Sequence, residues 1–312
     1  MLQASNGRAD TFHPRWFGLL PEETRAQFAS FLNYVELIGE WPSQLAITLI
    51  KLIPKAKGGK RPIGLLTGLV RLWERIRIHE VRAWKTIAYR GYNWAARGRS
   101  AQDAIWKQNM TCEAAAAEGR TAIAKLADLR KAYEMVPLEN VWRAGLKMHF
   151  PPWILRLELE AFAAARTVVV NGAYANPVDT LSALVAGGSF ATDFLFTVLA
   201  EPCDQILLEH PRQPLCTIDI FLYADDVVTL VTGPSGGAAN TEAVDVTENL
   251  LDKFEGAMKM EVSRSSKPWK LDKGAKSIAL ASASRARQRL KPSMRRLGID
   301  TVGWAENLGV DF

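Results

Sequence analysis

The sequence predicts an α+β fold in which helices are layered on a sheet. From residue 121 onward, strand-type and helix-type runs follow each other in the order β-α-α-β-β-α-β-β-α-β, which is typical of this class. Two of these strands end in carboxylates, which favours a chemical role for the sheet. A chain of 312 residues with 48% hydrophobic residues can bury one large core or two smaller ones.

The first third of the chain predicts a helix and then a basic flap. Pro21 suits the first turn of a helix, and acidic residues directly after it favour the positive helix end. Two strands joined by a Lys/Gly-rich loop follow, and Pro62 requires an edge or strand-start position. Thr67 can cap the next helix, with Trp73 and Ile76 pointing inward. The expected elements are a helix over residues 21–38, strands over 46–53 and 61–66, a helix from 67, a Gly/Arg/aromatic loop over 90–100 and a helix over 102–118.

The rest of the chain predicts the main sheet. Asn171-Gly172 lies after an apolar run and signals a hairpin. The expected elements are a strand over residues 121–129, helices over 137–150 and 152–166, a hairpin over 166–174, a helix over 189–210, strands over 216–223 and 227–232, a helix over 241–258 and a strand over 277–281. The basic segment from Ser282 is expected to hold no finished element.

Charge is distributed in three blocks. The net charge is +9 over residues 1–110, −9 over 111–260 and +6 over 261–312. Residues 50–99 carry thirteen basic residues and two acids; this indicates a polyanionic partner, although a solvated basic helix face stays an alternative. Three scattered cysteines favour a reducing compartment and no disulfide framework. Because neither a membrane-spanning apolar run nor a signal-peptide pattern is present, we expect no membrane contact and an intracellular location.

Two adjacent acids, Asp225 and Asp226, lie between the apolar runs 218–223 and 227–231, so they fall at the tip of a tight hairpin. Desolvated neighbouring carboxylates repel unless a cation neutralises them, and hard oxygen ligands suit a divalent metal. An exposed turn without a role stays an alternative. Asp128 ends another strand, and the three carboxylates converge if the two strands are neighbours. Two cations about 4 Å apart would then activate a hydroxyl group and stabilise a leaving pyrophosphate.

Three stretches of this region resemble the palm motifs of reverse transcriptases. Tyr223-Ala-Asp-Asp226 looks like their Y-x-D-D motif. Asp128, followed five residues later by Tyr133, is similar to their first palm motif. Residues 186–192 (Ala-Gly-Gly-Ser-Phe-Ala-Thr) resemble the Gln-Gly-rich motif that leads into a long helix. The order of the motifs makes the resemblance far more specific than a single Asp-Asp pair.

A fourth stretch resembles the fingers motif of the same family. Lys55, a short loop and then Arg61-Pro-Ile match its basic residue, loop and Arg-Pro-Ile. Together the four motifs extend the resemblance over about residues 30–280. Trp41-Pro42, the Arg-Pro-Ile form and Leu-Gly-Val-Asp at residues 308–311 resemble non-long-terminal-repeat (non-LTR) retroelements, with group II intron-type enzymes as the nearest other branch.

The resemblance implies a right-hand polymerase fold with fingers and palm, in which helices back an antiparallel palm sheet and the thumb is absent or truncated. The domains that it implies are an N-terminal helical extension over residues 1–45, fingers over 46–120, a palm over 121–281 with a fingers return around 151–185, and a truncated start of the thumb over 282–312.

The resemblance also implies a two-metal active site. It assigns catalytic and metal-binding roles to Asp128, Asp225 and Asp226, with the backbone carbonyl of Leu129 as an extra metal ligand. The ions would be two Mg²⁺, with Mn²⁺ as an alternative. For the incoming nucleotide it implies Lys55 and Arg61 as a triphosphate clamp, Tyr133 as a gate against the 2′-hydroxyl, Gly187 and Gly188 at a close backbone approach, and Lys276 as the proton donor to pyrophosphate, with Lys267 and Lys273 as competitors.

The loop over residues 90–100 mixes arginines with aromatic residues, which suits stacking on bases or sugars. An Arg-rich surface loop with a buried tryptophan stays an alternative. The predicted nucleic-acid-binding residues are Arg90, Trp94, Arg97, Arg99 and Tyr223.

The chain departs from the family pattern in one motif. Ala186 stands where the family has Gln, and Ala191-Thr192 stands where it has Ser-Pro. Asp193 adds a charge near the start of the following helix, where the positive dipole tolerates it.

The function implied is the RNA-directed DNA polymerase domain of a retroelement. Its partners would be an RNA template, a DNA or RNA primer and dNTPs, and its location the nucleus if the source is a eukaryotic retroelement. A catalytically weakened nucleic-acid-binding relic or fragment is one alternative. An RNA-dependent RNA polymerase is another, and Ala224 and Tyr133 argue against it, because such enzymes usually have Gly-Asp-Asp and a small or polar residue at the sugar gate.

Overall fold

The computed structural model describes residues 15–55, 59–180, 182–210, 215–235, 237–258, 277–282, 284–303, 306–307 and 310–311. These residues fall into two compact units. The first lies within Met1–Ala88 and Tyr133–Val198, and the second within Tyr89–Ala132 and Leu199–Phe312. Each unit combines helices with a sheet, so the predicted α+β class is confirmed. The predicted domain limits at residues 45, 120 and 281 stay predictions.

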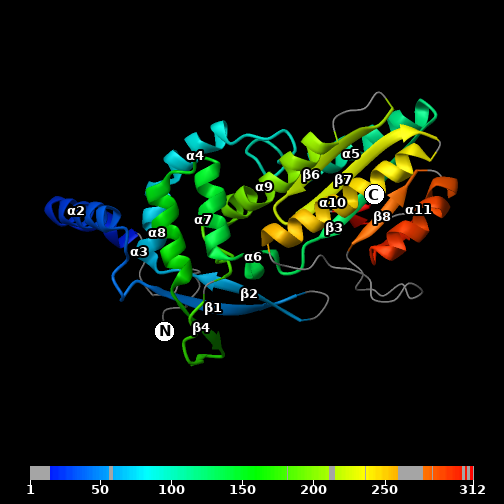
Figure 1. The fold of residues 1–312 in the computed structure, drawn as a ribbon. Helices are drawn as coiled ribbons and strands as arrows, with labels where there is room; N and C mark the ends of the chain where they lie inside the picture. The colour runs from blue at the N-terminus through cyan, green and yellow to red at the C-terminus, as the bar shows by residue number, and fades with distance from the viewer. Residues whose placement is uncertain are drawn as a thin grey trace. The chain divides into compact units, whose positions relative to one another are not determined.

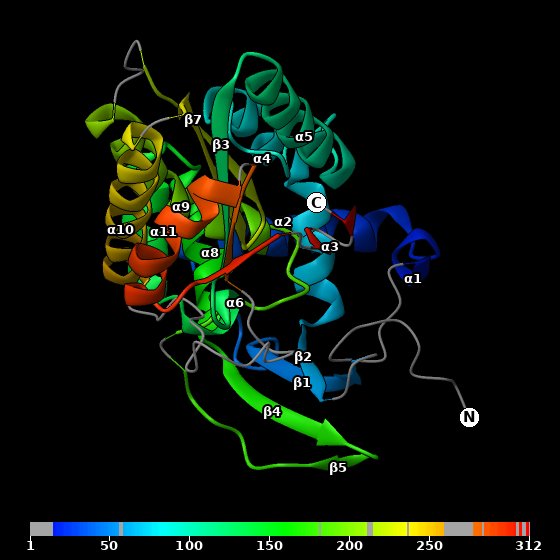
Figure 2. The ribbon, with the colours of Figure 1, turned by 90° about the vertical axis from the view of Figure 1, so that its right-hand side faces the viewer.

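The first unit contains a four-stranded sheet with the order β2-β1-β4-β5. Its strands are β1 (Ile47–Pro54), β2 (Lys60–Leu65), β4 (Ala165–Val170) and β5 (Ala173–Tyr174). β1 pairs antiparallel with β2 and parallel with β4, and Figure 2 shows β4 continuing into β5 as a hairpin. Asn171 and Gly172 turn this hairpin with φ angles of 51° and 82°, as an Asn-Gly pair predicts. Because β2 is an edge strand, Pro62 is tolerated there.

The helices of the first unit follow the predicted order. They are α1 (Arg15–Gly18), α2 (Glu22–Ile38), α3 (Gly68–Ile76), α4 (Ile78–Ile87), α7 (Leu138–Lys147), α8 (Pro152–Ala163) and the first part of α9 (Ala191–Glu209), and the short α6 (Ala132–Met135) begins at the boundary between the units. α2 ends at Gly39, whose φ of 74° closes the helix in the left-handed region. Trp73 is buried, as expected, and so is Trp84.

Three details of the helix expected from Thr67 are wrong. The chain forms two helices that meet at Arg77 rather than one. This break ends the apolar stripe, so Ile76 is 44% exposed instead of pointing inward. Thr67 does occupy the position before α3, but its side chain makes no capping hydrogen bond. The capping box of this region is at α5 (Ala101–Ala117), where the side chains of Ser100 and Asp103 each accept from the other's backbone N–H.

The second unit contains a five-stranded sheet with the order β6-β7-β3-β8-β9 (Figure 1). Its strands are β3 (Arg120–Asp128), β6 (Thr217–Tyr223), β7 (Asp226–Pro234), β8 (Ile278–Ala281) and β9 (Asp300–Val302); the short pair β10 (Glu306–Asn307) and β11 (Val310–Asp311) lies outside this sheet. β3 pairs antiparallel with both β7 and β8. The antiparallel palm-type sheet that the sequence predicts is therefore present, with one parallel strand, β9, at its edge.

The segment from Ser282 does form finished elements, contrary to expectation. Helix α11 (Ser284–Arg296) leads into β9, which joins the sheet beside β8. Ala286, Leu290 and Met294 recur every four residues and are buried, so they supply an apolar stripe along an otherwise basic helix. Pro292 lies inside this helix, and this proline together with the high charge obscured the stripe in the sequence.

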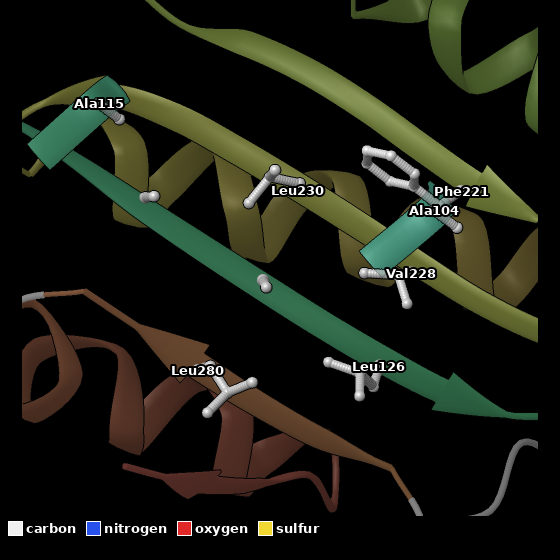
Figure 3. Packing of buried hydrophobic residues seen from close by; sticks show 9 residues of the cluster. Ala104, Ala115, Leu126, Phe221, Val228, Leu230 and Leu280 are labelled. Carbon is white, nitrogen blue, oxygen red and sulfur yellow. The ribbon is translucent and has the colours of Figure 1, made fainter. Parts of the chain in front are cut away.

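Helices cover both faces of the second sheet. α5 contacts β3 and β7, as does α10 (Ala238–Met258), while α11 contacts β8 and β9. Side chains alternate between the faces of a strand, so every second residue of β3 packs toward α5. The resulting core consists of Ala104, Ala115, Ala122, Ala124, Leu126, Phe221, Val228, Leu230 and Leu280, and Figure 3 shows these side chains on one face with α10 and α11 behind the sheet. No helix among the described residues is long and apolar enough to cross a bilayer.

Leu230→Ala is expected to destabilise the second unit by about 2–5 kcal/mol, because Leu230 is 0% exposed in the middle of this core. The free energy of unfolding from urea titration measures the effect. Leu208→Ala on α9 is the matched control, since Leu208 is 78% exposed and its truncation should change stability by less than about 0.5 kcal/mol. Equal effects of the two substitutions would contradict this core.

Candidate active site

The three predicted catalytic acids lie at one end of the second sheet. Strands β3 and β7 are neighbours, and Asp128 is the direct cross-strand partner of Asp226. Asp226 in turn pairs with Tyr223 across the β6-β7 hairpin. Directly opposed residues of an antiparallel pair lie on the same face of the sheet. The expectation that the two acid-bearing strands are neighbours is therefore confirmed, and the register sets the carboxylates of Asp128 and Asp226 side by side.

The hairpin turn places Asp225 next to this pair. Its two turn residues are Ala224 and Asp225, and Ala224 adopts a φ of 55°, which is the left-handed region that a tight two-residue turn requires. All three acids are partly exposed, so solvent reaches them. Leu129, by contrast, is 2% exposed; its buried side chain fixes the end of β3.

A residue that the sequence analysis missed anchors the Asp128 backbone. The backbone N–H of Asp128 donates to the Ser277 hydroxyl at 3.2 Å, and Ser277 is 1% exposed directly before β8. This bond ties the end of β3 to the start of β8. Lys276, the predicted proton donor, precedes Ser277 but lies outside the described residues, as do Lys267 and Lys273.

The donor chemistry of the acids fits Mg²⁺ or Mn²⁺, because carboxylate oxygens are the ligands that these ions prefer. Asp128 and Asp226 offer such oxygens from neighbouring strands, and Asp225 adds a third carboxylate in the adjoining turn. Within the described ranges, no group of three or more His, Cys, Asp or Glu residues is already gathered as a metal site. Neighbouring carboxylates repel one another, and a bound cation would offset this repulsion.

In the first unit, strand β2 and the loop around Gly187 are joined. Arg61 lies on β2 opposite Ile53, and farther along the strand the Gly64 N–H donates to the Ala186 carbonyl at 3.1 Å. Gly187 has a φ of 123°, and a Cβ atom there would lie 2.8 Å from the Gly64 carbonyl oxygen. Gly187 thus approaches β2, the strand that carries Arg61, and its predicted approach to the nucleotide stays a prediction.

Two further predicted site residues, Gly188 and Lys55, also lie in the first unit. A Cβ atom on Gly188 would lie 2.8 Å from the ring of Phe162 on α8, so glycine is needed for packing. Lys55 is exposed at the end of the β1-β2 flap, where its N–H donates to the Gly59 carbonyl at 3.1 Å. The predicted flap of two strands is confirmed. Nucleotide binding by Lys55 and Gly188 stays a prediction.

Tyr133 contacts the same glycine-containing segment. Its carbonyl accepts from the Leu184 N–H at 2.7 Å, and its hydroxyl lies 3.2 Å from the Thr192 hydroxyl. Thr192 stands where the family has proline, so this hydroxyl contact is a feature of the present chain. Hydrogen bonds thereby connect Tyr133 to the segment that contains the Gly187 loop, and that segment to β2, within the first unit.

Asp193 in the first turn of α9 has a specific partner. Lys85 on α4 approaches its carboxylate to 2.8 Å. Burial raises the pKa of Asp193, and the Lys85 ammonium opposes that shift. The ion pair adds to the favourable helix dipole that the sequence predicts for this position.

Two of the predicted nucleic-acid-binding arginines have partners within the second unit. Arg90 donates to the carboxylate of Asp204 at 3.0 Å, and this hydrogen bond raises the pKa of the guanidinium against the effect of burial. Arg99 lies 4.6 Å from the centre of the Trp94 ring and donates to the Asn93 carbonyl at 3.1 Å. Both arginines therefore help to fold the 90–100 loop.

The other predicted nucleic-acid-binding residues differ in their environment. Trp94 stacks on Phe221 at 5.5 Å between ring centres and is partly buried against the sheet. Arg97 is exposed, and Tyr223 is partly exposed beside Asp226. Contact of all five residues with nucleic acid stays a prediction.

Sequence reasoning missed a polar cluster in the first unit. It consists of Arg71, Glu74, Glu158 and Ser189. Glu74 forms an ion pair with Arg71 and accepts a hydrogen bond from Ser189, and the buried Glu158 lies beside Glu74. A signal for it was present, since Glu74 is one of only two acids in the basic block over residues 50–99.

Comparison with known proteins supplies independent information. A profile of the family described as reverse transcriptase (RNA-dependent DNA polymerase) matches residues 53–264, about two thirds of the chain. Among solved structures, telomerase from Candida tropicalis in complex with a TWJ fragment of telomeric RNA aligns with a TM-score of 0.56 at 10% identity, covering 84% of this chain and 45% of that chain. The apo form truncated from its C-terminal domain aligns with a TM-score of 0.48 at 13% identity, covering 70% and 49%.

These similarities cover only part of the matched structures. The chain spans about half the length of the telomerase structures that it matches. No curated protein matches it in sequence. At 10% identity, the alignment with the RNA-bound telomerase shows the fold alone, and this confirms the right-hand polymerase fold. The match over residues 53–264 contains the acids, the glycine loop and Arg61, and the chain belongs to the reverse transcriptase (RNA-dependent DNA polymerase) family, a family of nucleotidyltransferases.

Proposed function

We propose that this chain is the RNA-directed DNA polymerase domain of a retroelement, which adds dNTPs to the 3′-hydroxyl of a DNA or RNA primer on an RNA template. The observation that carries the proposal is the register that pairs Asp128 with Asp226 beside the Tyr223–Asp226 turn. Family membership supports the reaction class. The Arg-Pro-Ile form and Trp41-Pro42 support the non-LTR branch, and a nuclear location follows if the source is eukaryotic.

In this proposal the second unit performs the chemistry. Asp128 and Asp225 hold two Mg²⁺ ions, or Mn²⁺, with Asp226 and the Leu129 carbonyl in support. When bound, the ions activate the primer hydroxyl and stabilise the charge on the leaving pyrophosphate. The Ser277 hydroxyl holds the backbone of Asp128, which keeps its carboxylate aimed as a preorganised ligand.

The proposal assigns nucleotide contacts to Lys55, Arg61, Tyr133 and Gly187. Lys55 and Arg61 donate charged hydrogen bonds to the triphosphate, as cationic side chains do for phosphates. The Tyr133 ring excludes a 2′-hydroxyl, and its hydroxyl contact with Thr192 holds the ring in place. Gly187 gives the nucleotide access to the backbone. Lys276 protonates the pyrophosphate.

Primer extension on an RNA template with Mg²⁺ tests the proposal. The wild-type protein is expected to add dNTPs in preference to NTPs, and Asp225→Asn is expected to lose incorporation by about a hundredfold or more, because the substitution keeps the shape but removes the charge. Loss of activity on removal of Mg²⁺ with EDTA, and recovery with Mg²⁺ or Mn²⁺, completes the test.

The alternatives give different results in the same assay. RNA binding without extension by either protein would favour a non-catalytic relic. Preference for NTPs would favour an RNA-dependent RNA polymerase. Extension that survives Asp225→Asn would show that the metal site is elsewhere.

A further inference from the structure

Helix α3 holds both ends of the Gly187–Ser189 loop. The Arg71 guanidinium donates to the Gly187 carbonyl. Glu74, one turn later on the same helix, accepts from the Ser189 N–H at 2.9 Å with one carboxylate oxygen and from the Ser189 hydroxyl at 2.8 Å with the other. Arg71 and Glu74 also pair with each other at 3.1 Å. Two side chains at i and i+3 lie on one helix face, so they clamp the loop as a unit.

A second buried acid, Glu158 on α8, adjoins this clamp. Glu74 and Glu158 are both 0% exposed. Among the described residues, neither carboxyl oxygen of Glu158 bonds to Arg71 or to the Gly187–Ser189 loop. Burial, and then the Glu74 carboxylate, raise the pKa of Glu158 well above its usual range. Of the two buried carboxyl groups, Glu74 is the one that contacts Arg71 and the Ser189 N–H, so the clamp itself consists of Arg71 and Glu74.

This arrangement is costly if its purpose is packing alone. Burying charged groups seldom improves on apolar residues of similar size, and the neighbouring core of this unit is apolar, with Phe162 and Phe194 fully buried. The polar atoms of the cluster are instead directed at the backbone of one loop. That loop contains Gly187, whose φ of 123° only glycine adopts readily, and it is bonded to the strand that carries Arg61.

We propose that Arg71 and Glu74 are positioning residues that hold the Gly187–Ser189 loop in its nucleotide-binding conformation. The assignment of the loop to the nucleotide rests on the proposed function. Ala186, directly before the loop, is held through its backbone carbonyl, which accepts from the Gly64 N–H, and α3 holds the loop itself through Arg71 and Glu74.

The test compares two isosteric substitutions of buried glutamates, Glu74→Gln and Glu158→Gln. Glu74→Gln removes the charge that balances Arg71 and is expected to speed amide hydrogen exchange in a peptide covering residues 186–192 by about tenfold, and to raise the KM for dNTP by about tenfold with a smaller change in kcat. Glu158→Gln keeps the Arg71–Glu74 ion pair and both hydrogen bonds to Ser189, and is expected to leave both values within about twofold of wild type. Glu139→Gln, an exposed acid on α7, is the matched control.

The outcomes separate this proposal from the proposed function. If the wild-type protein incorporates no nucleotide, the proposed function fails, and the exchange of residues 186–192 still decides the clamp. If Glu74→Gln does not fold, Arg71→Gln gives the same comparison from a side chain that is 29% exposed. Equal effects of Glu74→Gln and Glu158→Gln, or unchanged exchange in the loop with Glu74→Gln or Arg71→Gln, would overturn the proposal.

Discussion

Asp128→Asn is expected to reduce nucleotide incorporation by about a hundredfold or more, with little change in RNA binding or folding. Asp128 ends β3 opposite Asp226, and its carboxylate is one of the proposed metal ligands. Asparagine keeps the size and one oxygen, but removes the negative charge that a divalent ion requires from this ligand. Single-turnover primer extension over a range of Mg²⁺ concentrations measures both the rate and the apparent affinity for the ion.

Asp219→Asn is the matched control for this prediction. Asp219 lies on β6, four residue pairs from Tyr223 along the same hairpin, so the substitution changes the net charge of the same sheet equally. It is expected to change incorporation by less than about twofold, because no metal is assigned to it. A similar loss from both substitutions would mean that the overall charge of the sheet matters, rather than the ligands at its end.

The site in the second unit could be predicted because its signals are local. The Tyr223–Asp226 turn lies between two β-branched runs, and Asp128 directly follows an apolar run, so each strand end is visible in the sequence. The structure then confirms that the two strands are neighbours. The exact pairing of Asp128 with Asp226 was not predictable, because it depends on register between segments about one hundred residues apart.

The interactions that sequence reasoning missed join distant segments. Arg90 forms a hydrogen bond with Asp204, and Glu74 forms one with Ser189; in each pair the two residues are more than one hundred positions apart. Composition can show that a block is basic but not which arginines are paired, so structural arginines such as Arg90 look the same as arginines that contact a polyanion. The C-terminal strand β9 was missed for a related reason: three residues carry little pattern, and parallel pairing with β8 is decided by the fold.

Gly187→Ala is expected to destabilise the first unit by at least about 1–3 kcal/mol and to impair nucleotide incorporation more than any other substitution in that unit. Two causes combine. A φ of 123° is strained for any residue with a side chain, and the added Cβ atom would lie 2.8 Å from the Gly64 carbonyl oxygen. Because Gly64 N–H bonds to Ala186, relief of that clash moves the loop away from β2.

Two glycine variants separate strain from crowding in this prediction. Gly172→Ala introduces strain alone, since Gly172 has a φ of 82° with no atom within 4 Å of the added Cβ. Gly188→Ala introduces crowding alone, against the Phe162 ring at 2.8 Å. Urea unfolding and the KM for dNTP are measured for all three. Gly172→Ala is expected to lower stability without changing KM, whereas Gly187→Ala changes both. If Gly187→Ala lowers stability without changing the KM, as expected for Gly172→Ala, then the contact between the Gly187 loop and β2 does not position the nucleotide.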